Sequence, residues 1–345
     1  MHVEYNCVFN FAASYSGGGY KRLHAYAKWF NENGGALFVI NPRCAGLEAQ
    51  FPNNRFFIAA QSRIRRVFDD CAYLRAIEKE IGIPQLYYSY GIPLYFRFGE
   101  VNWFHLSNVL PLHAESIPLS LFDRLKMAYL GKRIRRGFAE ADVISAESNN
   151  SLSLIGDKFF RKLFLSVNGS DDELAYLQDQ SVEEKADVAT VLGTQRYKAI
   201  DDSFAVFEML KDKHRKLRLV ILGNPQSIPR ALRANSNVVM LGILDRYDVI
   251  DCLRRSKFFI STTYIENSYN AASEGIFIAD ESYISDIGPH RELLKGMPCD
   301  RVSVPGVSRR LLHVNRAALS GANLKKWDTV VVEMIERFRR TIQER

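Results

Sequence analysis

Two glutamates stand eight positions apart after an apolar run that predicts a strand. Glu266 and Glu274 begin and end the segment Glu-Asn-Ser-Tyr-Asn-Ala-Ala-Ser-Glu, which follows 257–262. We expect Glu266 in a loop and Glu274 about two turns into a helix, where small neighbours leave its carboxylate close-packed. Such a carboxylate needs hydrogen-bond donors, and sugar or ribose hydroxyls can supply them. The alternative is a capped helix that holds one glutamate in a structural ion pair.

The start of the same helix offers groups suited to a phosphate. Ser268 is a reasonable N-cap, and the backbone N–H groups that follow, at Tyr269 and Asn270, can meet an anion. Arg196 and Lys198 lie in a loop after an earlier strand, where arginine in a bidentate manner and lysine as a point charge can neutralise a diphosphate. Exposed loop cations are also common without any function.

Three glycines, Gly17, Gly18 and Gly19, join the first predicted strand to the first predicted helix. Without a Cβ in the way, backbone N–H groups and the helix N-terminus can approach an anion. Lys21 and Arg22 in the first turn are unfavourable for the helix but useful beside phosphate. The spacing is not Gly-x-Gly-x-x-Gly and no Gly-Lys-Ser/Thr follows, which excludes dinucleotide and P-loop sites. A tight turn for strand-to-helix packing is the alternative.

His105 lies at the end of a predicted strand, in Phe-His-Leu-Ser-Asn. A lone histidine there is either a structural residue or a group poised for proton transfer, and its polar neighbours Ser107 and Asn108 keep both interpretations open. His290, in the turn 285–292, is a further candidate to approach a bound sugar.

Short apolar runs alternate with helical patterns in both halves, which predicts parallel sheets covered by helices. The expected strands are 5–12, 36–41, 56–59, 86–89, 102–106, 143–146, 162–167, 187–193, 217–223, 238–241 and 257–262; the expected helices include 20–33, 202–211, 247–255, 269–275 and 327–345. The predicted domains are 1–168 and 187–325, joined by a polar linker at 169–186, with a C-terminal helix at 326–345 that packs back toward the first domain. Ligands of such sheets bind at the carboxyl ends of the strands, here in a cleft between domains.

Composition agrees with a globular protein of two domains, since the 345 residues are 47% hydrophobic and 25% charged. No apolar run approaches the roughly 20 residues that span a bilayer, and the first residues lack a signal-peptide pattern, so we expect a cytosolic protein. Five scattered cysteines favour neither disulfides nor a zinc site. The net charge of +7 calls for an anionic partner, such as nucleic acid, an anionic membrane or a phosphorylated substrate.

The cations concentrate in the segment 124–136, where apolar residues alternate with them. This pattern fits a basic amphipathic helix that rests on anionic headgroups, and equally a solvated helix that packs its apolar side on the core. A nucleic-acid partner is disfavoured because aromatic residues do not interleave with the basic runs. The membrane-facing candidates are Lys126, Lys132, Arg133, Arg135 and Arg136.

The spacing of Glu266 and Glu274 resembles the Glu-x7-Glu signature of the retaining GT-B glycosyltransferases of family GT4. The order of segments is also similar: the glycine loop, the basic pair, 238–244 before the glutamates, 285–292 after them, and Asn-Gly-Ser-Asp at 168–171 where the first domain ends. The resemblance implies two Rossmann-like α/β domains that face each other across a cleft. The N-terminal domain would bind the acceptor and the C-terminal domain the nucleotide-sugar.

The same resemblance implies roles for individual residues. Glu274 would hold the donor ribose, while Glu266 and the histidine His105 would lie near the donor sugar. The diphosphate and leaving group would be bound by Arg196 and Lys198, assisted by Gly193 and by the backbone of Ser268, Tyr269 and Asn270, with Gly17, Gly18 and Gly19 flanking diphosphate and acceptor. Because no Asp-x-Asp is well placed, we expect a metal-independent reaction without a cofactor, in which fixed cations stabilise the leaving diphosphate.

The implied activity is hexosyl transfer, with retention, from a nucleotide-diphosphate sugar to a glycan or lipid-linked acceptor. The implied setting is bacterial surface polysaccharide assembly, of lipopolysaccharide O-antigen or capsule, at the cytosolic face of the membrane. Two alternatives stay open: a non-catalytic GT-B subunit that scaffolds or activates a partner transferase, and a sugar-nucleotide 2-epimerase. Three departures from the family pattern bear on this choice: the two-residue spacing of Arg196 and Lys198 where about five is usual, and Tyr269 and Ala199 at positions that are commonly glycine.

Overall fold

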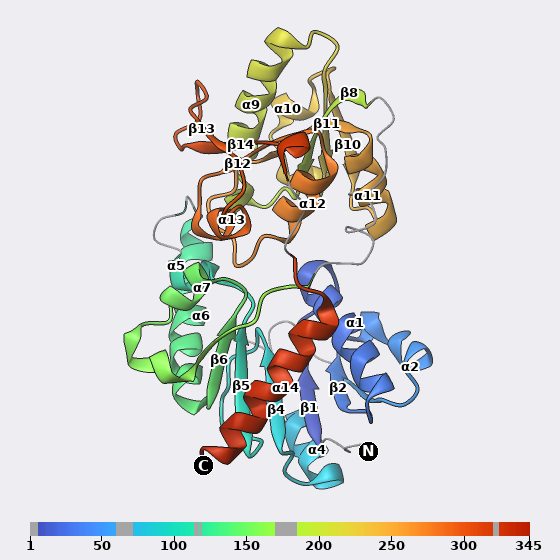
Figure 1. Cartoon of the computed structure of the whole chain (residues 1–345), viewed down its shortest axis with the longest axis vertical. Coiled ribbons are helices and arrows are strands. Elements are labelled where there is room, and N and C mark those ends of the chain that lie inside the picture. The colour runs from blue at the N-terminus through green and yellow to red at the C-terminus, as the bar shows by residue number, and fades with distance from the viewer. Residues whose placement is uncertain (1–5, 60–71, 114–116, 118, 170–184, 320–323) are drawn as a thin grey trace. The chain divides into compact units, whose positions relative to one another are not determined.

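The computed structural model describes residues 6–59, 72–113, 117, 119–169, 185–319 and 324–345. The chain divides into two compact units (Figure 1): an N-terminal unit of 1–114, 120–169 and 325–345, and a C-terminal unit of 115–119 and 170–324. The last helix, α14 (Trp327–Gln343), therefore belongs to the N-terminal unit. Most of the linker expected at 169–186, namely 170–184, lies outside the described residues.

The N-terminal unit is built on a seven-stranded parallel sheet in the order β3-β2-β1-β4-β5-β6-β7. The strand order reverses between β1 and β4, and open α/β sheets bind ligands beside such a switch point. The strands are β1 (Cys7–Asn10), β2 (Leu37–Ile40), β3 (Arg55–Ile58), β4 (Leu86–Tyr90), β5 (Val101–Leu106), β6 (Val143–Ala146) and β7 (Leu163–Leu165).

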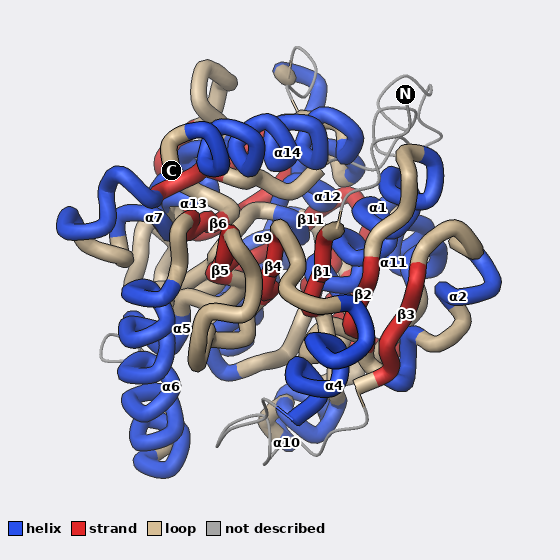
Figure 2. Tube along the Cα trace, turned by 90° about the horizontal axis from the view of Figure 1, so that it is seen from below, coloured by secondary structure: helices blue, strands red, loops and turns tan. Residues whose placement is uncertain are grey.

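Helices cover both faces of this sheet, and Figure 2 shows α14 and α1 on one side and α4 on the other. The ring centroid of Phe9 in β1 lies 5.1 Å from that of Phe38 and 4.8 Å from that of Phe30. Met334 of α14 belongs to the same core. Phe104 contacts Phe138 of α6 on the opposite face. The helices are α1 (Gly17–Glu32), α2 (Leu47–Gln50), α4 (Ala72–Ile81), α5 (Leu110–His113), α6 (Leu121–Glu140) and α7 (Asn149–Ser153), with short 3-10 turns η1 (Pro42–Cys44) and η3 (Asp157–Lys162).

The C-terminal unit carries a second seven-stranded sheet, in the order β10-β9-β8-β11-β12-β14-β13. Its first five strands are parallel, whereas β14 pairs antiparallel with both β12 and β13. No strand was predicted after 257–262, so the prediction lacked this antiparallel edge. Its strands are short, and several of their positions are polar. The bounds are β8 (Ala186–Leu192), β9 (Arg218–Leu222), β10 (Val238–Gly242), β11 (Ser256–Ser261), β12 (Glu281–Ser285), β13 (Asp300–Val302) and β14 (Leu311–Asn315).

Two cores flank this second sheet. Phe207 of α9 packs on one face, and Leu253 of α11 and Ile276 of α12 pack on the other. Gly275 allows α12 to lie directly on β11, because a Cβ there would come within 2.0 Å of the Phe259 ring. The helices are α9 (Ile200–Lys213), α10 (Arg230–Arg233), α11 (Arg246–Arg254), α12 (Asn270–Ile278) and α13 (Gly288–Leu293), with 3-10 turns η4 (Arg196–Lys198), η5 (Pro225–Ser227) and η6 (Arg316–Ala318).

The predicted α/β class, with two mainly parallel sheets, is confirmed. One local prediction needs correction: the glycines expected in a loop before the first helix form its first turn, since α1 begins at Gly17. Within the described residues, no helix is both long enough and apolar enough to cross a membrane.

Candidate functional site

The carboxyl ends of β8 and β11 bring Lys198 and Glu266 together. The two strands are parallel neighbours, so the segments after them begin at the same edge of the sheet. Lys198 Nζ donates to Glu266 Oε1, and the two side chains are only 12% and 20% exposed. Burial opposes the charge on Lys198, but Glu266 and then Tyr197 outweigh burial and raise the pKa of Lys198. Lys198 is therefore fully charged at neutral pH.

His290 in α13 lies within electrostatic range of this ion pair. Its Nδ1 is 2.7 Å from the carbonyl oxygen of Ser285, which can only accept a hydrogen bond. Burial lowers the pKa of His290, against the raising effect of Glu266 and with the further lowering effect of Lys198. The neutral ring therefore carries its proton on Nδ1 and keeps Nε2 as an acceptor. A cation, a carboxylate and a neutral imidazole thus gather at one sheet edge.

The turn between β8 and α9 fixes the position of Lys198. Gly193 has a φ of +89°, and a Cβ there would lie 3.3 Å from the Cε of Lys198. Ala199 has a φ of +46° and is the one non-glycine residue of the described chain with positive φ. Its carbonyl oxygen accepts hydrogen bonds from Thr262 Oγ1 at 2.8 Å and from the backbone N–H of Ser203. Backbone strain of this kind persists only where surrounding contacts hold it.

Arg196 behaves differently from its neighbour Lys198. It opens the 3-10 turn η4, where its side chain is exposed and forms no ion pair with any other described residue. The two cations predicted to act together therefore occupy different environments: Lys198 is largely buried against Glu266, and Arg196 is in solvent.

Glu274 lies in α12, is 6% exposed, and is held by an arginine that was not among the predicted site residues. Arg246 Nη1 lies 2.6 Å from Glu274 Oε1. Arg246 is the first residue of α11, and the strands that precede α11 and α12, β10 and β11, belong to the same sheet. The signal that could have identified it is a cation in the first turn of a predicted helix, where it is unfavourable for the helix itself. Glu274 is thus buried as predicted, and its charge is paired with that of Arg246.

Apolar side chains flank Arg246 on the surface, since Ile243 and Tyr247 are both exposed.

The start of α12 differs slightly from the prediction. The N-cap position is Tyr269, not Ser268, and it makes no side-chain capping bond. The Oγ of Ser268 still accepts a long bond of 3.4 Å from the N–H of Asn270. Tyr269 has a φ of −124°, an ordinary value for any residue, so this loop does not need the glycine that is common in the family pattern.

The glycines at the start of α1 have separate structural reasons. Gly17 has a φ of +62°, and a Cβ at Gly19 would lie 2.9 Å from Ser14 Oγ and 3.0 Å from the Tyr90 ring. Arg22 is fully buried and donates to the carbonyl oxygens of Ser166 and Val167. The prediction that Arg22 lies beside a phosphate is therefore wrong, because its guanidinium is taken up by these contacts. These contacts tie α1 to the chain after β7.

His105 belongs to a buried network in the N-terminal unit. Its ring is fully buried, stacks at 4.9 Å on Tyr90, and places Nδ1 2.8 Å from Ser145 Oγ. Burial and the charge of Arg22 lower the pKa of His105 to about 4. Because the ring has no exposed surface, any influence on a ligand would pass through its neighbours; its predicted role beside a sugar stays a prediction.

Glu147, which follows β6, is the carboxylate of this network, and it was not among the predicted site residues. Its Oε1 accepts from the Tyr90 hydroxyl at 3.0 Å and lies 3.5 Å from His105 Nε2. Burial opposes the charge, but the histidine, Arg22 and the tyrosine outweigh burial and lower the pKa of Glu147. No motif marks this residue, because its partners come from two other strands, β4 and β5, and from the helix α1.

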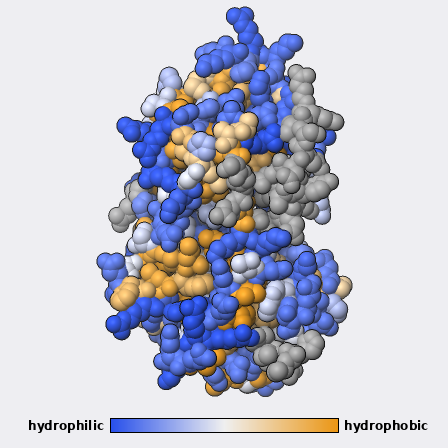
Figure 3. Space-filling model, viewed as in Figure 1, coloured by the Kyte–Doolittle hydropathy of each residue, from blue (hydrophilic) through white to orange (hydrophobic). Residues whose placement is uncertain are grey.

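The segment 124–136 lies in α6, and its outer face carries both apolar and basic side chains. Leu121 and Phe122 are each 76% exposed and Leu125 is 65% exposed. The flank of the N-terminal unit that carries α6 in Figure 1 is rich in apolar surface in Figure 3. The opposite face packs inward through Met127, Gly131, Ile134, Gly137 and Phe138. Four predicted cations are exposed, at Lys126, Lys132, Arg135 and Arg136, and the fifth, Arg133, is partly buried over the Tyr95 ring.

Neither a protein-family model nor a curated protein matches the sequence. Solved structures match in fold. Sucrose-phosphate synthase from Thermosynechococcus elongatus has a TM-score of 0.65 at 10% identity, covering 98% of this chain and 99% of that one. A glycosyltransferase involved in avilamycin A biosynthesis gives 0.57 at 13% identity, with 98% of each chain covered. The α,α-trehalose 6-phosphate synthase from Burkholderia multivorans gives 0.56 at 12% identity, covering 85% and 86%.

At these identities the likeness is one of fold. The predicted GT-B fold, with two Rossmann-like units, is confirmed by both full-length matches and by the two parallel-dominated sheets.

Proposed function

We propose that this chain is a glycosyltransferase, of the hexosyltransferase class EC 2.4, that uses a nucleotide-diphosphate sugar and retains the anomeric configuration. The observation that carries the proposal is the ion pair of Lys198 and Glu266, with His290 beside it, at the carboxyl edge of the C-terminal sheet. Ligands of open α/β sheets bind at this edge. A largely buried cation next to a carboxylate suits the two ends of such a donor, its diphosphate and its sugar hydroxyls.

Donor binding would redistribute the charges of this pair. The diphosphate would take Lys198 as its counter-ion, with the exposed Arg196 closing over it, and Glu266 would turn to accept hydrogen bonds from the sugar. As the bond to the anomeric carbon breaks, negative charge grows on the leaving diphosphate, and a fixed lysine stabilises that charge most where water is excluded. In this proposal the chain's own cations, rather than a metal, carry that task.

The nucleoside would lie toward Glu274 and Arg246. Glu274 would accept hydrogen bonds from the ribose hydroxyls while its ion pair with Arg246 orients the carboxylate. Exposed Ile243 and Tyr247 flank Arg246 and offer apolar surface to a base. The backbone of Ser268, Tyr269 and Asn270 at the start of α12 would assist at the phosphates.

The acceptor would be a glycan or a lipid-linked molecule, in bacterial surface polysaccharide assembly at the inner face of the membrane. The outer face of α6 supports this setting, because exposed apolar side chains combined with lysines and arginines favour an anionic lipid surface. Gly17, Gly18 and Gly19 at the start of α1, and the buried His105 network, would border the acceptor side.

A thermal-shift screen with UDP, GDP, ADP, dTDP and CMP tests the donor assignment. We expect one nucleoside diphosphate to raise the melting temperature, and the shift to shrink strongly in Glu274→Gln and in Lys198→Met. A shift of equal size in both variants would refute the assignment of these residues.

The non-catalytic subunit remains the second candidate. The observation that favours it is that both proposed donor-binding carboxylates are already held in ion pairs. Absence of any shift with all five nucleotides would support it over the transferase.

A further inference from the structure

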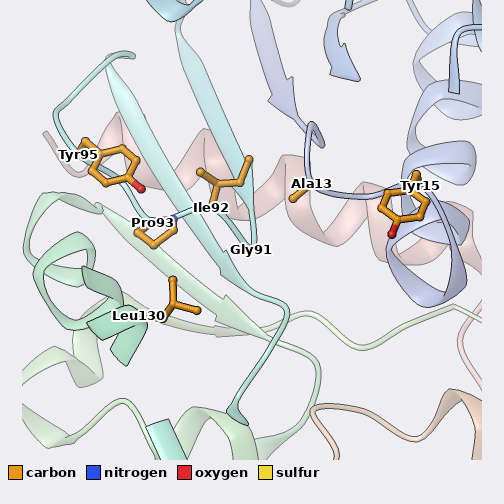
Figure 4. A pocket seen from close by; sticks show the side chains of 7 residues that line it. All are labelled: Ala13, Tyr15, Gly91, Ile92, Pro93, Tyr95 and Leu130. Carbon is orange, nitrogen blue, oxygen red and sulfur yellow. The ribbon is translucent and has the colours of Figure 1, made fainter. Parts of the chain in front are cut away.

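The N-terminal unit contains a pocket of about 260 Å³ at the carboxyl ends of β1 and β4. The chain after β1 and the chain after β4 form two of its sides, and α6 contributes the third (Figure 4). The residues that line it include Ala13, Tyr15, Ile92, Pro93, Tyr95 and Leu130.

The lining of this pocket is mainly apolar. Aliphatic groups of Ile92, Pro93 and Leu130 lie between the two tyrosines, Tyr15 and Tyr95 (Figure 4). A pyranose placed here would bury hydroxyls against aliphatic carbon, and each hydroxyl left without a hydrogen bond would oppose binding. An alkyl or isoprenoid chain, by contrast, gains free energy for each methylene that leaves water. The lining therefore favours a hydrocarbon chain over a sugar.

Each of the two tyrosines carries an arginine on its ring. The guanidinium carbon of Arg43 lies 4.7 Å from the centroid of Tyr15, and that of Arg133 lies 4.2 Å from the centroid of Tyr95. Among the described residues, no carboxylate forms an ion pair with either arginine. A guanidinium stacked by its face keeps N–H donors at its edge, the arrangement that binds phosphate oxygens. Two positive charges thus flank an apolar pocket.

The position of Arg133 on α6 connects the pocket to the outer face of that helix. Successive residues of a helix are rotated by about 100° around its axis. On α6 this rotation places Arg133 between the side of the helix that carries Leu125 and Tyr129 and the side that carries Leu130. The stripe is exposed, whereas Leu130 lines the pocket. A molecule that reaches the pocket past Arg133 therefore has an apolar surface beside it.

We propose that this pocket binds the hydrocarbon chain of an amphiphile that carries a phosphate or diphosphate, with Arg43 and Arg133 as counter-charges to its anionic group. This inference deepens the proposed function, because the amphiphile would be the lipid-linked acceptor of the transfer. Binding itself needs no donor and no catalysis, so it can be tested independently.

Calorimetric titration of the full chain with decyl phosphate, kept below its micelle concentration and without any nucleotide, tests the proposal. We expect decyl phosphate to bind at least tenfold more tightly than either decanol or inorganic phosphate. Leu130→Trp, which fills the pocket, should weaken binding at least tenfold, and the matched variant Leu125→Trp on the exposed stripe should leave it within twofold. Arg43→Gln with Arg133→Gln should bring decyl phosphate down to the affinity of decanol.

A second variant protects the test against misfolding of Leu130→Trp. Ala13 is exposed at the rim, so Ala13→Glu should fold and still repel the phosphate. Unchanged binding in both Leu130→Trp and Ala13→Glu would overturn the pocket assignment, and equal affinities for decanol and decyl phosphate would overturn the role of the arginines. Loss of nucleotide binding with intact decyl phosphate binding would instead count against the proposed function alone.

Discussion

Lys198 and Glu266 form an ion pair although 68 positions separate them in the chain. Each follows a different strand, Lys198 after β8 and Glu266 after β11, and these strands are parallel neighbours. Parallel strands end at a common edge, so the residues after them meet without any local sequence relation. The pair places a nearly buried charge at the sheet edge where this fold class binds ligands, and the other features of the candidate site lie around it.

The first prediction separates the two members of this pair. Lys198→Met should weaken binding of the nucleoside diphosphate about 10- to 100-fold, since a charge-assisted hydrogen bond contributes about 1.5–3 kcal/mol. Glu266→Gln should bind the nucleotide at least as well as the parent, because it releases Lys198, yet lose most transfer activity. Titration calorimetry measures the first effect and sugar transfer the second. Lys213→Met, an exposed lysine at the end of α9, is the control, and equal affinities of Lys198→Met and this control would contradict the prediction.

The sequence was sufficient for most of the parallel strands and for the burial of Glu274. Strands buried on both faces read as apolar runs, as in 257–262, and Ala and Gly around Glu274 indicate close packing. The antiparallel edge was missed because β13 and β14 are only three and five residues long and mix polar residues with apolar ones. Short polar strands acquire their order from neighbours in the sheet rather than from their own pattern.

The partners of the candidate residues could not be predicted. Arg246 reaches Glu274 from another helix, and Glu147 meets His105 from a neighbouring strand end. Such contacts depend on strand order, which a single sequence does not specify. Arg22 is a residue for which the predicted partner was wrong. Its place in the first turn of a helix predicted a phosphate contact, whereas in the fold it is buried against Ser166 and Val167.

A second prediction concerns the ion pair of Arg246 and Glu274. Removing one partner of a nearly buried pair leaves a charge without compensation, which typically costs 3–5 kcal/mol, and partial exposure of Arg246 reduces our expectation to about 2 kcal/mol. Arg246→Met should therefore lower the free energy of unfolding by about that amount, and adding Glu274→Gln should recover a large part of it. Urea denaturation of both single variants and the double variant measures the coupling. Additive effects would show that the pair does not interact energetically.

A third prediction uses the strained turn before α9. A non-glycine residue in the left-handed region costs about 1–2 kcal/mol, partly offset by the greater chain entropy of glycine when unfolded. Ala199→Gly should therefore stabilise the protein by about 1 kcal/mol, whereas Gly193→Ala, at a φ of +89° beside the Lys198 side chain, should destabilise it. Melting temperatures that move in the same direction for both variants would contradict this assignment of strain.

A fourth prediction follows from the buried histidine of the N-terminal unit. The pKa of His105 is lowered to about 4, below its unfolded value near 6.5, so the unfolded chain binds the extra proton first. The contribution of neutral His105 to the free energy of unfolding is complete above pH 6.5. It is lost as the pH falls toward 4, and the free energy of unfolding drops by roughly 3 kcal/mol over that window. The lowered pKa of Glu147 acts in the same direction at lower pH.

Replacing the histidine isolates this contribution. His105→Asn should be less stable than the parent at pH 7, where the network is lost, but should show a shallower decline between pH 6.5 and pH 4.5. Urea midpoints at intervals of half a pH unit give both slopes. Parallel curves would mean that His105 does not supply the pH dependence.

The last prediction tests the membrane role of α6 through its apolar side chains rather than its charges. Leu121 and Phe122 are each 76% exposed, and insertion of one such side chain is worth about 1.5–3 kcal/mol. Leu121→Ser with Phe122→Ser should therefore reduce binding to anionic vesicles by at least about 100-fold while the melting temperature changes little. Ile243→Ser is the matched control, because Ile243 is 85% exposed but belongs to the C-terminal unit. The basic residues add about 1 kcal/mol each near an anionic surface, so replacing Lys132 and Arg136 with glutamine should weaken binding mainly at low salt. Vesicle flotation measures all three variants, and equal flotation of the serine double variant and the Ile243→Ser control would remove α6 from the membrane-binding surface.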